Sequence, residues 1–220
     1  MRNFLLVQLL LLLAVAGVAS ASERPCVPVT VPVPVCSQVA DVTELGCGIT
    51  ECVAYASAAD WAEEVQVIFR LPAPPHGGPW LVDRVAFFMS GTEEHDVVIR
   101  TVRSGAPAEV LDESIVFAAG YSAWPPADWT YVALANMIPP YQSYLVLGGG
   151  DYISIGIRMK PDDCLGLASA GATEGEPWSF VDGQWEADEA MTPAVRIGLI
   201  DLGSSAVESQ NWGSIKRLFR

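Results

Sequence analysis

The sequence predicts an all-β fold, an antiparallel β-sandwich of jelly-roll-like form with about eight or nine short strands. Short runs rich in β-branched and aromatic residues recur from Val65 onward, and Gly, Pro, Asp and Ser separate them. Apolar and polar residues alternate most clearly along Tyr152–Met159, which indicates a strand with one buried and one outer face. Because no helical pattern separates the runs, we expect an antiparallel sandwich and not the parallel sheet of an α/β protein.

The expected strands lie between Val65 and Leu202. They are Val65–Arg70, Leu81–Met89, Asp96–Arg103, Ser114–Phe117, Trp129–Ala135, Tyr144–Leu147, Tyr152–Met159, Trp178–Val181 and Ala194–Leu202. The breaks between them carry turn residues, above all Pro72–Pro79, Ser104–Pro107 and Gly148–Gly150. We place the sandwich domain at residues 63–202.

The start of the chain has the three-part layout of a secretory signal peptide, which we assign to residues 1–21. A short positive start precedes the apolar run Phe4–Val18, and Ala19-Ser20-Ala21 supplies the small residues that a signal peptidase reads. The run is shorter than the roughly 20 apolar residues of a membrane span. We expect cleavage before Ser22, a secreted or cell-surface location, and no membrane span in the mature chain.

A Pro- and Cys-rich lead, residues 22–62, follows the signal. Its alternate prolines, in Val27–Pro34, favour extended chain because proline lacks a backbone donor and restricts φ.

The five cysteines all lie in the exported part of the chain, where disulfides form and persist. Their odd number leaves one thiol free or paired with another chain. From their spacing we expect the local pairs Cys26–Cys36 and Cys47–Cys52, with Cys164 left over. A structural zinc site is the alternative, but it needs about four ligands and both histidines lie far from the cysteines.

The composition excludes some partners. Twelve basic and 26 acidic residues give a formal net charge of −14, which argues against nucleic acid because phosphate neutralisation needs a basic face. The acidity permits cation binding, and it also serves solubility. We expect no cofactor other than calcium, and the partners we consider are a cell-surface component or a polysaccharide.

Two kinds of residue in the segment from Trp178 to Glu189 are candidates for binding. Asp182, Glu186 and Asp188 could offer oxygen ligands to calcium, although their spacing is not that of an EF-hand loop and a solvated turn is the favoured alternative. Trp178 and Trp185 flank this turn, and their rings could stack on sugar faces. The alternative is that these tryptophans close the end of the sandwich core.

No catalytic motif emerges from the sequence, and we therefore expect no enzyme. Gly120–Trp124 lacks the second glycine of a nucleophile elbow, and the chain holds no H-E-x-x-H zinc motif and no phosphate loop. A Ser/His/Asp set could be assembled only from residues distant in sequence. Paired carboxylates for glycoside hydrolysis stay open because acids are plentiful, but nothing marks one pair.

The last segment, residues 203–220, is a small polar linker followed by a basic tail. On a helix, Trp212, Ile215 and Phe219 would share one face, with Lys216 and Arg220 elsewhere. We expect either a sorting or anchoring signal or a terminus docked on the domain.

A pattern of strands and the C-terminal tail together resemble features of a known class of proteins. The strand Tyr152–Ile157, the Trp-bearing hairpin near Trp178 and the final strand near Ala194 resemble jelly-roll-like accessory domains of secreted bacterial proteins. The tail Trp212–Arg220, of the form W-G-x-I-K-x-L-F-R, is similar to short C-terminal tails of such exported proteins. The resemblance implies no catalytic residues.

Three functions follow in order of preference. The first is a secreted or surface-displayed, non-catalytic β-sandwich module, retained or sorted through its tail. The second is a carbohydrate-binding module, and the third is a hydrolase that acts on glycans.

Overall fold

In the part of the chain that it describes, the computed structural model contains sixteen β-strands and no α-helix. That part comprises residues 26, 29–35, 42–56, 63–91, 94–118, 124–126, 128–134, 145–160, 163–169, 174–188 and 191–203. Every strand pairing is antiparallel. The prediction of an all-β antiparallel sandwich is therefore confirmed.

The strands form three sheets, which we call A, B and C. Sheet A contains β1 (Thr30–Pro32), β3 (Glu51–Ala56), β6 (Met89–Ser90), β12 (Cys164–Ser169) and β15 (Met191–Pro193). Sheet B contains β2 (Val42–Leu45), β5 (Trp80–Phe87), β9 (Thr130–Ala133), β10 (Val146–Leu147) and β16 (Val195–Asp201). Sheet C runs in the order β14 (Gln184–Ala187), β13 (Gly175–Val181), β4 (Glu64–Arg70), β11 (Tyr152–Arg158), β7 (Glu94–Arg103) and β8 (Ala106–Ala118).

Every strand expected from the sequence is present, with small shifts of its ends. The structure also contains strands that were not expected, among them β12, β14 and β15, which lie outside every predicted range. In addition, β8 extends over Ala106–Ala118, whereas the sequence predicted only Ser114–Phe117. Strands β1, β2 and β3 belong to the segment that we placed ahead of the sandwich domain, yet β2 pairs with β16 and β3 pairs with β12. The described part of this segment is thus built into the sheets.

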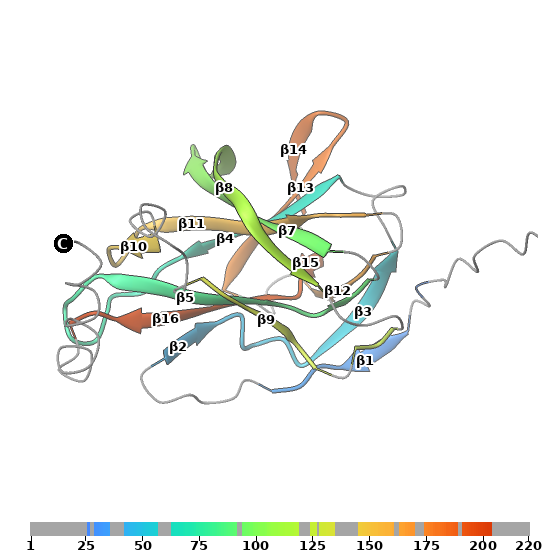
Figure 1. Cartoon of the computed structure of the whole chain (residues 1–220), viewed down its shortest axis with the longest axis horizontal. Coiled ribbons are helices and arrows are strands. Elements are labelled where there is room, and N and C mark those ends of the chain that lie inside the picture. The colour runs from blue at the N-terminus through green and yellow to red at the C-terminus, as the bar shows by residue number, and fades with distance from the viewer. Residues whose placement is uncertain are drawn as a thin grey trace, which may run out of the picture.

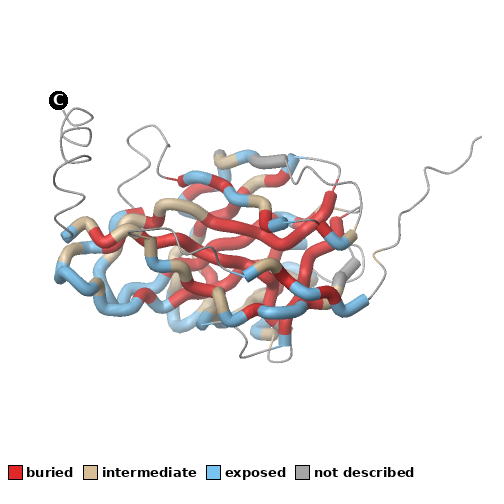
Figure 2. Tube along the Cα trace, turned by 90° about the horizontal axis from the view of Figure 1, so that it is seen from below, coloured by how far each residue is buried: buried red, intermediate tan, exposed pale blue. Residues whose placement is uncertain are grey.

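The main core lies between sheets B and C, which form the lower and upper layers in Figure 1. Alternate residues of β4 and β11 point into it, namely Val65, Val67, Phe69, Ile153, Ile155 and Ile157. They meet side chains of β5 and β16, including Trp80, Phe87, Val195 and Ile197. Figure 2 shows these central strands as buried along most of their length. Burial of this apolar surface is the main stabilising contribution to the fold.

A second, smaller core lies on the other side of sheet B. Phe88 packs there against the rings of Trp124 and Trp129, at centroid distances of 5.6 and 5.5 Å. Val31 and Val33 of the proline-rich segment cover these rings. The buried Arg196 side chain fastens the segment in place, because its guanidinium lies 3.7 Å from the Trp129 ring and donates to Pro34 O.

Candidate functional site

The outer face of sheet C carries the polar residues that strand alternation turns away from the main core. Since Val65 and Val67 of β4 point inward, Glu64 and Gln66 point outward, and the same holds for Ser154 of β11. These three residues are nevertheless buried, with 3%, 0% and 0% exposure. An outer face that is buried must be covered by another part of the chain.

The cover comes from the curling of sheet C itself. Strands β14 and β8 are the opposite edges of the sheet, yet they contact one another. In Figure 1 the β13–β14 hairpin and β8 rise on either side of the sheet. The register of β8 against β7 shifts several times, and such irregularities increase strand twist and bend the strand. The sheet therefore encloses its own outer face.

Within this curl, Glu64 is the centre of a hydrogen-bonded network. Its two carboxylate oxygens accept bonds of 2.7 Å from Nε and Nη2 of Arg100, which is a bidentate arrangement. Arg100 also donates to Ala108 O at 2.9 Å. The Glu64 side chain is only 5% exposed, so burial is compensated by pairing with a charge of opposite sign.

The amide of Gln66 extends the network to neighbouring strands. Its Nε2 donates to Glu64 Oε1 at 2.7 Å and to Val98 O at 3.2 Å, and its Oε1 accepts from the Ser154 hydroxyl at 2.8 Å. Each polar atom of this side chain has a partner, as a buried amide requires. The network therefore fixes the positions of four side chains on three strands.

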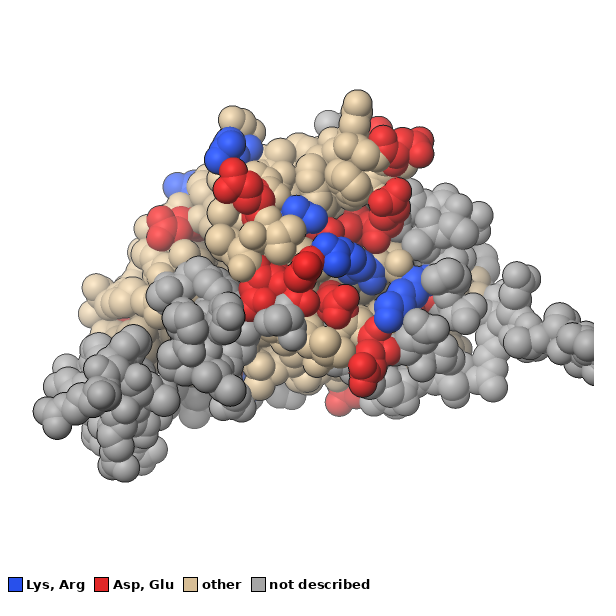
Figure 3. Space-filling view, turned by 45° about the horizontal axis from the view of Figure 1, so that its top comes forward, with Lys and Arg blue, Asp and Glu red and all other residues tan. Residues whose placement is uncertain are grey.

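Trp185 of β14 lies at the rim of the curl. Its ring packs against Phe180 at a centroid distance of 5.1 Å, and the Arg100 guanidinium lies 5.1 Å from the ring centroid. Both contacts hold the ring while leaving it partly exposed. The exposed Arg158 and Glu113, which form an ion pair, lie on the same face. Figure 3 shows acidic and basic side chains side by side across the face over sheet C.

The structure places Trp178 on the same face as Trp185. Trp178 of β13 is paired with Ala187 of β14 and with Gln66 of β4. Trp185 of β14 is paired with Phe180, which lies two residues after Trp178 on β13 and therefore on the same face. Both tryptophans are partly buried. The face thus combines aromatic surface with hydrogen-bonding groups held in fixed positions.

The three acidic residues considered for calcium lie around the β13–β14 turn. Asp182 sits in the turn itself with φ of 50°, Glu186 is exposed on β14, and Asp188 is partly buried after it. Within the described ranges, no group of three or more His, Cys, Asp or Glu side chains is positioned to hold a metal ion. The structure therefore does not bring these three carboxylates together.

The cysteine pairing differs from the prediction. Cys26 is bonded to Cys164, which corrects the expected Cys26–Cys36 pair and the expected free Cys164. Cys52 is free and buried, which corrects the Cys47–Cys52 pair. Cys47 is disulfide-bonded, and its partner lies outside the described residues, as does Cys36. Sequence proximity was misleading because the antiparallel sheet brings the start of the chain to β12.

The free thiol of Cys52 lies in the second core. Burial raises its pKa to about 12, so the thiolate is not populated at neutral pH. We therefore do not assign a nucleophilic role to Cys52.

Each histidine has an aspartate partner that sequence distance concealed. His95 Nε2 lies 3.3 Å from Asp163 Oδ1, and both side chains are almost completely buried. His76, in the Pro72–Pro79 loop, places its backbone N–H 2.7 Å and its ring Nδ1 3.1 Å from Asp201 Oδ2. Burial opposes ionisation of Asp201, but the backbone donors of His76 and Gly203 outweigh it and lower the pKa of the carboxyl.

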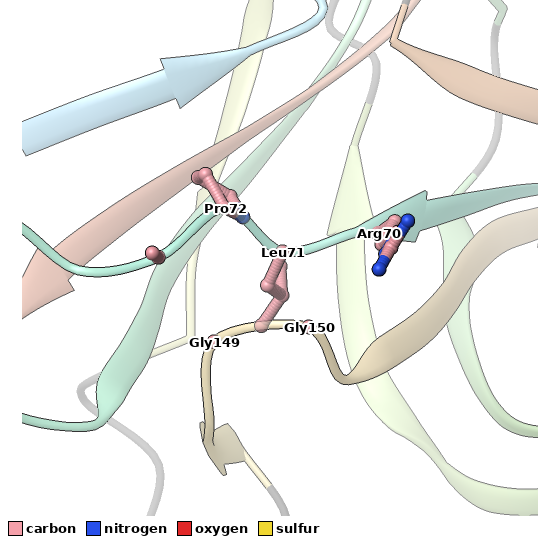
Figure 4. A pocket seen from close by; sticks show the side chains of 6 residues that line it. Arg70, Leu71, Pro72, Gly149 and Gly150 are labelled. Carbon is pink, nitrogen blue, oxygen red and sulfur yellow. The ribbon is translucent and has the colours of Figure 1, made fainter.

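An open hollow of about 460 Å³ lies where β4 ends and β11 begins. The residues that line it are Arg70, Leu71, Pro72, Ala73, Gly149 and Gly150 (Figure 4). From the sequence, Gly149 and Gly150 were expected only to form a tight turn.

The tail residues Trp212, Ile215, Lys216, Phe219 and Arg220 lie outside the described residues, so their role as a sorting signal stays a prediction. The described part contains no helix of the length and apolarity needed to cross a membrane.

Comparison with known proteins gives little similarity. No family model and no curated protein matches the chain, so the resemblance to accessory domains of secreted proteins also stays a prediction. A solved structure of the clostridial cysteine protease Cwp84, determined after propeptide cleavage, is similar with a TM-score of 0.49 and 11% identity. The similarity covers 76% of this chain and 42% of that one, so this chain spans less than half of the protease structure.

This comparison overturns one prediction. From the sequence we expected no enzyme, whereas the similar structure is that of a protease, and we withdraw the expectation. At this TM-score and identity, no activity is transferred from the protease to this chain.

Proposed function

We propose that this chain is an exported β-sandwich protein that binds a carbohydrate on the outer face of sheet C. Export is supported by the Cys26–Cys164 disulfide, since disulfides persist in oxidising compartments outside the cytosol. The observation that carries the binding proposal is the Trp185 ring, which is partly exposed and held between Phe180 and the Arg100 guanidinium.

Sugar recognition requires an apolar ring to stack on and polar groups in fixed positions around it. Trp185 and Trp178 supply rings, and the rim residues Arg158 and Glu113 supply charged groups with side chains that are 45% and 50% exposed. The buried network beneath them holds Arg100 in place before any ligand arrives. Such preorganisation lowers the entropic cost of binding.

The test is isothermal titration of the full chain, purified in its oxidised form, with a panel of neutral and uronic-acid oligosaccharides. Trp185→Ala should weaken the affinity for a bound oligosaccharide by about tenfold or more, which corresponds to about 1.4 kcal/mol of lost stacking. Trp185→Phe should retain part of the affinity because it keeps a ring.

Tyr131→Ala is the matched control, because Tyr131 is a 42% exposed aromatic residue on β9 of sheet B, away from the proposed site. It should leave the affinity unchanged. Thermal unfolding of each variant separates lost binding from lost folding. Absence of binding to every oligosaccharide, or equal affinity of wild type and Trp185→Ala, would refute the proposal.

A further inference from the structure

Arg70 and Tyr152 lie at the far end of the same outer face of sheet C. They are opposite each other in the β4–β11 register, and the Arg70 guanidinium is 6.0 Å from the Tyr152 ring centroid. Arg70 is six positions along β4 from Glu64, which corresponds to about 20 Å of strand. The pair is therefore separate from the Trp185 rim but on the same surface.

The Tyr152 ring is well exposed. The residue is 49% accessible, and it is one of the few large apolar or aromatic side chains of the described residues that are open to solvent. An exposed ring with a guanidinium over it offers both a stacking surface and directed donors.

The hollow beside Arg70 has walls that are fixed by their own backbone. Gly150 N donates to Leu71 O at 2.8 Å, and Leu71 N donates to Asp151 O at 2.9 Å. A Cβ on Gly149 would lie 2.8 Å from Pro74 Cδ, so only glycine allows the two loops to approach this closely. In Figure 4 the Leu71 side chain fills the space toward the Gly149–Gly150 loop, while Arg70 projects separately from the end of β4. The hollow is thus formed before a ligand binds.

Arg70 differs from the other basic residues in its contacts. The remaining Lys and Arg side chains within the described ranges each have an oxygen partner. Arg84 forms an ion pair with Glu44, and the others donate hydrogen bonds in the pairs Arg100–Glu64, Arg103–Glu109, Arg158–Glu113, Lys160–Glu94 O and Arg196–Pro34 O. Within the same ranges the Arg70 side chain forms no ion pair or hydrogen bond, and its guanidinium lies over the Tyr152 ring. The nearby carboxylate of Asp151 is turned to Gly148 N, at 2.6 Å. A guanidinium that forms no ion pair with a described carboxylate, and that lies beside a preformed hollow, is suited to an anionic ligand.

We propose that Arg70, Tyr152 and the adjoining hollow form a subsite for a uronic-acid unit of an acidic polysaccharide, with Arg70 binding the carboxylate and Tyr152 stacking on the ring. This inference rests on the proposed function and specifies its ligand class. A guanidinium binds a carboxylate through two parallel hydrogen bonds, which a neutral sugar cannot reproduce.

The experiment compares a uronic-acid oligosaccharide with its carboxyl-reduced counterpart of the same length, by isothermal titration of the full chain. Wild type should bind the acidic form about tenfold more tightly, the value expected for a charge-assisted hydrogen-bonded pair. Arg70→Gln should abolish this difference while leaving the affinity for the reduced form unchanged. Arg103→Gln is the control, because it removes another exposed guanidinium, 73% exposed, on β7.

The outcomes separate this inference from the proposal on which it rests. If both oligosaccharides bind equally and Trp185→Ala weakens both, the uronic-acid subsite is refuted and the carbohydrate face stands. If Arg70→Gln keeps the wild-type preference, the subsite is also refuted. If neither oligosaccharide binds, both proposals fall.

Discussion

The ion pair between Glu64 and Arg100 provides the sharpest test of the structure, through the substitution Glu64→Gln. The carboxylate accepts two bonds of 2.7 Å from Arg100, and the Glu64 and Arg100 side chains are 5% and 15% exposed. The substitution removes the negative charge and turns one acceptor oxygen into a donor that faces the guanidinium. Arg100 is then left partly buried without its counter-charge.

Breaking a buried pair from one side costs about 3–5 kcal/mol. Arg100 keeps its bond to Ala108 O and its contact with the Trp185 ring, which places the expected loss at about 3 kcal/mol, the lower end of that range. With a urea dependence of about 2 kcal/mol per molar, the unfolding midpoint should fall by about 1.5 M.

The matched control is Glu109→Gln. Glu109 and Arg103 form a contact of similar length, 3.0 Å, but their side chains are 71% and 73% exposed. Solvent screens such a pair, so its loss should cost less than about 1 kcal/mol. Both variants are measured by urea unfolding at neutral pH. Equal midpoint shifts for the two variants would show that the curl of sheet C does not exclude water from Glu64, and the reasoning would fail.

Two further predictions concern the disulfide and the pH dependence. The double variant Cys26→Ser, Cys164→Ser removes a crosslink between positions 138 residues apart, and it should lower the free energy of unfolding by up to about 5 kcal/mol, the value expected from loop closure. The control variant Cys52→Ala should keep the crosslink. An unchanged urea midpoint of the double variant would contradict the assigned pairing. The lowered pKa of Asp201 means that its contribution to stability is complete above its unfolded value of 3.8 and is lost as pH falls through the folded pKa. Between neutral pH and about pH 2, wild type should therefore lose more stability than Asp201→Asn, and parallel unfolding curves for the two proteins would refute this assignment.

Strand alternation allowed the main core to be predicted from the sequence. Ile153, Ile155 and Ile157 were expected to share the buried face of one strand, and all three lie in the core between sheets B and C. Local pattern is sufficient here because the side-chain period of a strand is two wherever the strand pairs. The turn residues between the runs located the strand ends for the same reason.

The same alternation placed Ser154 on the outer face of the strand but did not indicate that this face is covered. Ser154 was expected on an outer face, and its 0% exposure follows from the approach of β8 and β14. That approach depends on irregular pairing between β7 and β8, which no local pattern in Ala106–Glu113 indicated. For this reason the Glu64–Arg100 pair was not found in advance, although Trp185 was.

The sequence by itself determined that this protein is an antiparallel all-β chain with cysteines, acidic turns and a tryptophan-bearing hairpin, because these properties reside in short stretches of residues. Only the tertiary structure decided that Cys26 bonds to Cys164, that the buried Glu64 pairs with Arg100, and that Arg70 lies against Tyr152 and lines a hollow with Gly149. Cys26 and Cys164 are 138 positions apart in the sequence, and Glu64 and Arg100 are 36 positions apart. The physical reason is that antiparallel pairing and the curling of a sheet bring distant segments together through the packing of the whole chain.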